Sequence, residues 1–241
     1  MVNPAHIMAK YEIIDGVAIL PEGIEMIEER AFWNCKDLKR VVIPQWVRRI
    51  GEMAFYGCKN LELVEFPEWL EVIGEHAFED CSSLKELNLP QWVKRIENWA
   101  FSGCSSLQNL SIPSSVTHIG DSAFFGCSSL VRIKVDSNNP VYDSREDCNA
   151  IIHTESNALI SGCSNTIIPP SVTSIGDCAF WSCTSLTQIS LPPSVISIGD
   201  CAFWGCTSLT QINLPPSVTS IEDSAFWGCT SLTQISIPPS V

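Results

Sequence analysis

The chain has 241 residues, of which 27 are acidic and 14 basic, for a net charge of −13 at pH 7. This acidic balance argues against nucleic acid as a partner, because nucleic-acid-binding surfaces carry a basic stripe. Hydrophobic residues make up 45% of the chain, which suffices for a continuous core. No apolar run approaches the roughly 18 residues of a membrane span.

Residues 1–19 are expected to form an N-terminal lead-in or cap, in which the segment YEIIDGVAIL supplies a first strand. This stretch lacks the basic region, apolar stretch and cleavage site of a secretory signal. An intracellular protein and a secreted chain without its leader both fit this start, so the compartment stays open.

From residue 20 the chain repeats every 23 residues, in a first block over 20–135 and a second over 167–241. Periods of about 20 to 50 residues are typical of solenoids, propellers and arrays. A coil this short cannot bury its own apolar face, so neighbouring coils must stack. An Ala-Phe pair marks each period, and a cysteine follows each Phe by three positions. The pairs begin at Ala31, Ala54, Ala77, Ala100, Ala123, Ala179, Ala202 and Ala225.

One coil, LTQISLPPSVISIGDCAFWGC from Leu186, predicts three pieces. The alternating start is a half-buried strand, which proline ends because it has no N–H for a ladder bond. A second short extended piece follows. Asp200 is then interpreted as the N-cap of a short helical turn that buries Phe203 and Cys206. The coil predicts a right-handed α/β repeat solenoid with a parallel sheet on one face and helical turns and extended segments on the other.

The consensus L-x-x-I-x-L-P-x-S-V-x-x-I-G-x-x-A-F-x-G-C-x-S, over about residues 20–241, resembles the BspA-like subfamily of leucine-rich repeats. The resemblance implies a leucine-rich-repeat horseshoe that is secreted or displayed at a microbial cell surface, with a role in adhesion. One departure is the column that usually holds an Asn ladder. Early coils place Trp46, Trp69 and Trp92 there, and indole cannot accept a hydrogen bond.

Eight of the twelve cysteines occupy one column of the repeat, where a small buried side chain suits stacking. The Cβ vectors of such a column run parallel, which disfavours bridging. We therefore expect a buried ladder of reduced thiols. Cys178 and Cys201 fall in a variable column and are expected to be more exposed.

The insertion over 136–166 is expected to form a β-hairpin module, and it resembles an insertion of BspA-like proteins. The runs NAIIHT and NALISG flank a polar turn near Glu155 and Ser156. A turn centred there places Cys148 opposite Cys163, a possible disulfide. A shift of one residue in the turn removes this pairing.

Motifs for catalysis are missing from the sequence: it has no Gly-rich phosphate loop, HExxH or GxSxG. Cys148 and His153 are the one thiol/imidazole pair, and two residues of a surface hairpin explain them better. The sequence thus predicts no enzyme, no cofactor and no metal site.

The outward columns of the sheet are the first candidate binding surface, since solenoids bind partners over extended faces. A solvated surface is the alternative for any one residue. The candidate residues are Arg40, Val42, Leu63, Glu65, Glu86, Asn88, Asn109, Arg132, Lys134, Gln188, Gln211 and Gln234.

An aromatic row after the Ala-Phe pairs is the second candidate. Exposed indoles would grip carbohydrate or protein. Stacking over the edge of the core is the favoured explanation. The row consists of Trp33, Tyr56, Phe125, Trp181, Trp204 and Trp227.

These features favour a non-enzymatic protein that binds a protein ligand through the sheet face, adhesin-like by resemblance. Carbohydrate binding through the aromatic row is one alternative. The other is a structural array, because the late coils are nearly identical and the chain stops at PPSV without a polar cap, which would leave a coil end open to end-to-end self-association.

Overall fold

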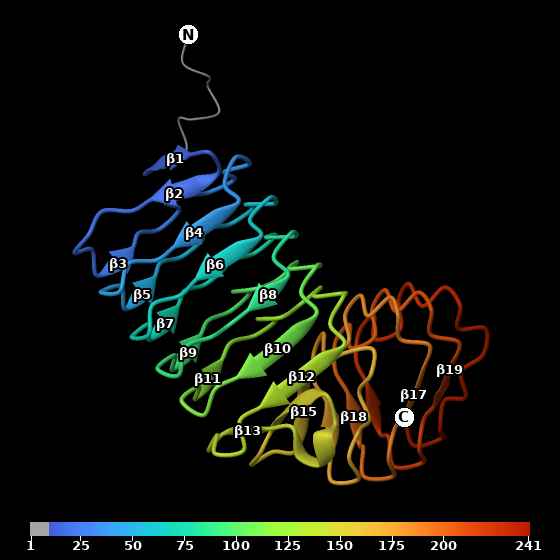
Figure 1. Cartoon of the computed structure of the whole chain (residues 1–241). Coiled ribbons are helices and arrows are strands. Elements are labelled where there is room, and N and C mark those ends of the chain that lie inside the picture. Colours follow the sequence, from blue (N-terminus) through green and yellow to red (C-terminus); the bar gives the residue numbers. More distant parts are fainter. Residues whose placement is uncertain (1–9) are drawn as a thin grey trace. The chain divides into compact units, whose positions relative to one another are not determined.

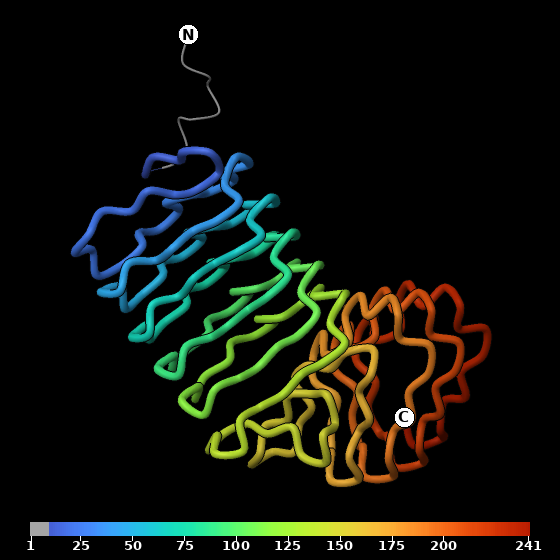
Figure 2. Tube along the Cα trace, viewed as in Figure 1, coloured from blue at the N-terminus to red at the C-terminus, as the bar shows by residue number. Residues whose placement is uncertain are grey.

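The computed structural model describes residues 10–241, which form stacked coils of a parallel β-solenoid (Figure 1). Part of the expected lead-in, residues 1–9, lies outside this described range. The chain divides into two compact units, an N-terminal unit ending at Cys127 and a C-terminal unit starting at Ser128. Within each unit the trace climbs by one coil per repeat (Figure 2).

Each coil of the N-terminal unit contributes two short strands. The first sheet opens with an antiparallel hairpin, β1 against β2, whose Asp15-Gly16 turn has positive φ at both residues, as tight hairpins require. From β2 the ladder continues in parallel to β4 and β6, and β8 pairs in parallel with β10. The strands are β1 (Glu12–Ile14), β2 (Val17–Ile19), β4 (Arg40–Val42), β6 (Leu63–Glu65), β8 (Glu86–Leu87) and β10 (Asn109–Ile112).

The second extended piece of each coil forms a parallel sheet of its own in the N-terminal unit. Its register advances by one repeat per strand, so that Arg49 pairs with Val72 and Val72 with Arg95. The strands are β3 (Met26–Ile27), β5 (Arg49–Ile50), β7 (Val72–Ile73), β9 (Arg95–Ile96) and β11 (His118–Ile119).

The C-terminal unit contains the hairpin insertion and the late coils. Strands β13, β14 and β15 are antiparallel, and β15 continues in parallel to β16, β18 and β20. A separate two-stranded ladder joins β17 to β19. The elements are β12 (Arg132–Val135), β13 (Tyr142–Asp143), a 3-10 helix η2 (Arg145–Asp147), β14 (Ala150–His153), β15 (Ala158–Gly162), β16 (Ser174–Ile175), β17 (Gln188–Ser190), β18 (Ser197–Ile198), β19 (Gln211–Asn213) and β20 (Ser220–Ile221).

A column of stacked phenylalanine rings forms the core of each unit. In the N-terminal unit the rings from Phe32 to Phe124 follow one another at centroid distances of 4.9–5.8 Å and nearly parallel planes. Phe180, Phe203 and Phe226 repeat this in the C-terminal unit at 5.0 and 5.4 Å. The alanine before each Phe is buried, which lets neighbouring coils approach closely.

The structure replaces the predicted helical turn with a series of tight turns, so the helical part of the predicted fold is not confirmed. Cys201 adopts a positive φ of 52°, and the N–H of Phe203 donates to the carbonyl of Ala225 in the next coil at 2.8 Å. Amides that bond between coils cannot bond within a helix. Asp200 is likewise no N-cap, because its carboxylate accepts the N–H of Asp223 in the next coil at 3.0 Å.

The cysteine column is a ladder of buried thiols that hydrogen-bond to main-chain carbonyls. In six of them the Sγ donates to the carbonyl of the Phe 26 residues earlier, at 2.9 Å for Cys58 to Phe32 and up to 3.4 Å for Cys104 to Phe78; these six are Cys58, Cys81, Cys104, Cys127, Cys206 and Cys229. None of the twelve cysteines is in a disulfide. Burial raises the pKa of Cys58 to about 12 and holds that of Cys81 well above its ordinary value. These thiols therefore act as small core residues.

The hairpin forms as predicted, but its register does not place the two insertion cysteines opposite one another. A bulge between Ile151 and Ile152 shifts the pairing by one residue between the turn and the base of the hairpin. The thiol of Cys163 consequently lies 3.4 Å from the carbonyl of Asn149, and that of Cys148 lies 3.9 Å from the carbonyl of Ala150. No bond joins the two sulfur atoms, so the suggested disulfide is absent from the structure.

Candidate binding surfaces

The outward columns of the first sheet form an exposed, chemically varied face in the N-terminal unit. Alternation along β4 buries Val41 and leaves Arg40 and Val42 exposed, and the same pattern recurs on β6, β8 and β10. We call this set the N-terminal sheet face. It consists of Arg40, Val42, Leu63, Glu65, Glu86, Asn88 and Asn109, of which only Leu63 is partly covered.

Charge on the N-terminal sheet face is paired at one end and unpaired in the middle. The Nε of Arg40 donates to Glu65 Oε1 at 3.0 Å across one coil step. In the described part of the chain, the side chains of Glu86, Asn88 and Asn109 make no hydrogen bond. Their donors and acceptors are thus available to a partner, while the exposed Arg40–Glu65 pair adds little stability by itself.

The remaining predicted face residues belong to the C-terminal unit. Arg132 and Lys134 are exposed on β12, and Gln188 and Gln211 are exposed on β17 and β19. Gln234 is exposed on the last coil, which forms no regular strand.

The predicted aromatic row is largely stacked on itself. The ring centroids of Trp181 and Trp204 lie 3.9 Å apart and those of Trp204 and Trp227 4.8 Å, with nearly parallel planes. Trp33 stacks on Tyr56 at 6.4 Å, and Phe125 packs on Trp99 at 5.1 Å. Stacking covers ring faces that a sugar would need, which supports the structural interpretation of the row.

We expect Trp204→Ala to lower the free energy of unfolding by about 2–3 kcal/mol, because the substitution removes two stacked pairs at once. Trp227→Ala is the matched control: its ring has one stacking partner and is 61% exposed, so its loss should cost about 1 kcal/mol. Urea unfolding followed by circular dichroism measures both. Equal effects would contradict a structural role for the stack.

A second set of tryptophans was missed as a candidate surface. Trp46, Trp69 and Trp92 are 56%, 38% and 45% exposed. The ring centroids of Trp69 and Trp92 lie 4.8 Å apart with planes tilted by 42°, and Arg48 lies over the Trp69 ring at 5.7 Å. The available signal was their position in the turn between two strands, where side chains face solvent. In late coils serine occupies this column, and Ser217 donates to the carbonyl of Val195 in the preceding coil at 2.7 Å.

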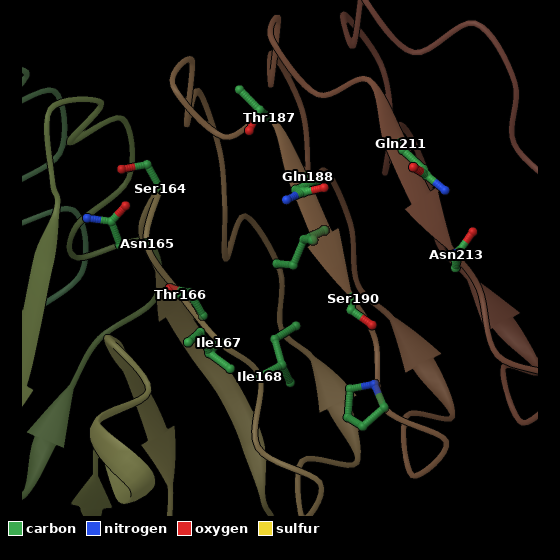
Figure 3. Close-up of a pocket in the computed structure, with 12 residues that line it drawn as sticks. Ser164, Asn165, Thr166, Ile167, Ile168, Thr187, Gln188, Ser190, Gln211 and Asn213 are labelled. Atoms are coloured by element: carbon green, nitrogen blue, oxygen red, sulfur yellow. The ribbon is translucent and has the colours of Figure 1, made fainter.

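A hollow of about 700 Å³ lies on the sheet face of the C-terminal unit (Figure 3). Strand β17 forms one wall and the segment 164–168 forms the other. Amide and hydroxyl side chains line it together with a few apolar ones, and none of the lining residues is charged. Ile167 is 75% exposed at its rim.

The thiol/imidazole pair has no catalytic geometry. Burial raises the pKa of Cys148 to about 11, so that its thiol is protonated at neutral pH. The ring of His153 instead contacts the Ser156 hydroxyl at 3.0 Å. Between residues 10 and 241, no cluster of three or more His, Cys, Asp or Glu residues could hold a metal ion. Over the same residues, no helix has the length and apolar character to cross a membrane.

The coils, their two parallel strands and their stacked core define a leucine-rich-repeat type of β-solenoid. A profile of the BspA type leucine rich repeat region matches residues 23–145 and 155–241, in six copies. The chain therefore belongs to the BspA-type leucine-rich repeat family.

Solved structures give the same result. The chain is similar to a leucine rich cell surface protein from Faecalibacterium prausnitzii, with 32% identity over 90% of this chain and a TM-score of 0.74. It is also similar to the pneumococcal vaccine antigen PcpA, with 25% identity over 79% of this chain and a TM-score of 0.68. The chain spans 65% and 54% of these two proteins. A comparison with curated proteins found no match.

Proposed function

We propose that the chain is a non-enzymatic binding protein that recognises a protein partner through the N-terminal sheet face, in the manner of an adhesin. The observation that carries this proposal is the row of exposed, unpaired polar side chains in the middle of that face. Strands hold these side chains at fixed spacing, which lowers the entropy cost of binding. The name of the Faecalibacterium protein supports a place at the cell surface.

A double charge reversal tests the proposal. We expect Arg40→Glu/Glu86→Arg to abolish capture of a partner from immobilised extracellular matrix proteins, because both charges are reversed while net charge is kept. Arg49→Glu/Glu75→Arg is the matched control, with the same substitutions at exposed residues outside the first sheet. Circular dichroism must show both variants folded. Equal capture by both would overturn the N-terminal sheet face as the site.

Carbohydrate binding is the second candidate, and Trp46 favours it, because its ring is 56% exposed and stacks on no other ring in the described part of the chain. Titration with cell-surface glycans should then quench tryptophan fluorescence, and Trp46→Ala should remove the quenching. Self-association of coils stays a prediction, which light scattering at increasing protein concentration tests.

A further inference from the structure

One coil of the C-terminal unit is shorter than the others. Five residues separate Cys163 from Pro169, whereas eight separate Cys183 from Pro192 at the equivalent place. The shortened piece, 164–168, forms no strand, although the coil that follows it forms β17.

Hydrogen bonds hold the segment 164–168 on the side away from β17. The hydroxyl of Thr166 donates to the carbonyl of Asn149 at 2.6 Å, and the N–H of Ile167 donates to the carbonyl of Cys148 at 3.0 Å. Asn165 Nδ2 donates to the carbonyl of Val131 at 3.2 Å. The segment is thus fastened to the base of the hairpin and to the preceding coil, which keeps its backbone from pairing with β17.

Strand β17 therefore has an open edge. It pairs with β19 alone, and in the described part of the chain no main-chain hydrogen bond links it to 164–168. In a parallel ladder, alternate residues direct both main-chain groups to the same neighbour. The carbonyl of Thr187 accepts the N–H of Thr210 in the next coil. The N–H and C=O groups of Gln188 and Ser190 must then point the other way, into the hollow.

We propose that this hollow binds an extended, uncharged peptide segment of a partner protein, which adds to the open edge of β17 as a parallel strand. Main-chain bonds to Gln188 and Ser190 would supply affinity, and the amide and hydroxyl walls would contact the side chains. A charged side chain would lose hydration there without gaining an opposite charge, because the lining carries none. The site is independent of the N-terminal sheet face, since it lies wholly in the other unit.

The probe is a synthetic peptide, SLTQINLPP, which copies residues 208–216, the strand already paired with β17 on its other edge. A fluorescent label and anisotropy measure its binding to the full chain. In a parallel register, the N–H groups of its isoleucine and second leucine face β17, and those of its glutamine and asparagine face away. We expect N-methylation of the isoleucine and the second leucine to weaken binding at least about tenfold, because it removes two N–H donors to β17. N-methylation of the glutamine and the asparagine should have little effect.

Substitutions in β17 also test whether the peptide binds through main-chain hydrogen bonds. Ser190→Pro removes one N–H from the open edge and leaves the ladder to β19 intact, so it should weaken binding at least about tenfold. Ser190→Ala keeps the N–H and should bind as the parent does. A thermal melt shows that both variants fold.

Three results would overturn the proposal. They are no binding of the parent peptide at millimolar concentration, equal affinity for both N-methylated peptides, and unchanged affinity of the Ser190→Pro variant. Displacement of the peptide by cellohexaose with unchanged Ser190→Pro affinity would instead indicate recognition of sugar hydroxyls by the side chains. None of these results bears on the Arg40/Glu86 variant, so failure here leaves the proposed function untouched.

Discussion

Raising the pH above about 9 is expected to destabilise the folded chain steeply, because the buried thiols ionise in the folded state only at a much higher pH than in the unfolded chain. Burial raises the pKa of Cys35 and Cys148 to about 11, and that of Cys58 and Cys183 to about 12. An exposed thiol in the unfolded chain ionises near pH 8.5. The stability that these four protonated thiols contribute is complete below that pH and falls as pH rises toward 11 or 12.

The expected slope is large. Each thiol that ionises only in the unfolded chain removes about 1.4 kcal/mol of stability per pH unit. Four such thiols together would lower the free energy of unfolding by about 5–15 kcal/mol, the whole stability of a typical domain, over about one to three pH units. Urea midpoints between pH 7.5 and 10.5, in the presence of a phosphine reductant, measure the slope.

Cys58→Ala/Cys183→Ala is the matched control for the alkaline transition. It removes two of the four thiols and should roughly halve their share of the slope above pH 9. Its stability at pH 7 should fall only modestly, since alanine keeps these positions apolar. A parent protein with the same urea midpoint at pH 8 and pH 10.5 would contradict the role of the thiol ladder.

Phe78→Ala is expected to be the most destabilising single substitution in the N-terminal unit. The ring is fully buried, stacks between Phe55 and Phe101 at 4.9 and 5.3 Å, and meets Phe66 edge-on at 5.8 Å. Its removal should cost about 3–5 kcal/mol, because both adjacent coils keep the cavity open. Urea unfolding followed by far-ultraviolet circular dichroism measures the loss.

Phe78→Leu separates ring stacking from simple burial. Leucine fills most of the volume and should cost clearly less than alanine, about 1–2 kcal/mol. Because each coil contacts only its neighbours, the unfolding transition should also broaden as the N-terminal unit loosens around this coil. A cost below about 1 kcal/mol for Phe78→Ala would show that the ring column does not hold the coils together.

The repeat itself was readable from the sequence for a physical reason. Each coil faces the same problem of burying one apolar face against a copy of itself, so the same residue types recur at the same phase. The 23-residue period predicted the parallel stacking, the inward Phe and Cys columns and the outward positions of Arg40, Glu86 and Asn109. The hairpin was also readable, because alternation and a polar turn are local signals.

Hydrogen-bond partners were decided only by the tertiary structure. Whether the N–H of Phe203 bonds within its own turn or to Ala225 of the next coil depends on how closely the coils approach, and the close approach replaced the predicted helical turn. The bulge at Ile151 and Ile152 shifts the β14–β15 pairing by one residue, so that Cys163 lies opposite Asn149 and not opposite Cys148. The alternation of apolar and polar residues along a strand does not reveal such a bulge.

The sequence by itself determined a stacked solenoid of the BspA type, since periodicity is a property of the chain. It did not determine where that solenoid leaves main-chain N–H and C=O groups without hydrogen-bond partners. The open edge of β17 exists because the segment 164–168 bonds to Asn149 and Cys148 at the base of the hairpin, and not to the following coil. A strand edge is open only where no neighbouring segment hydrogen-bonds to it, and these hydrogen bonds are formed only in the folded structure.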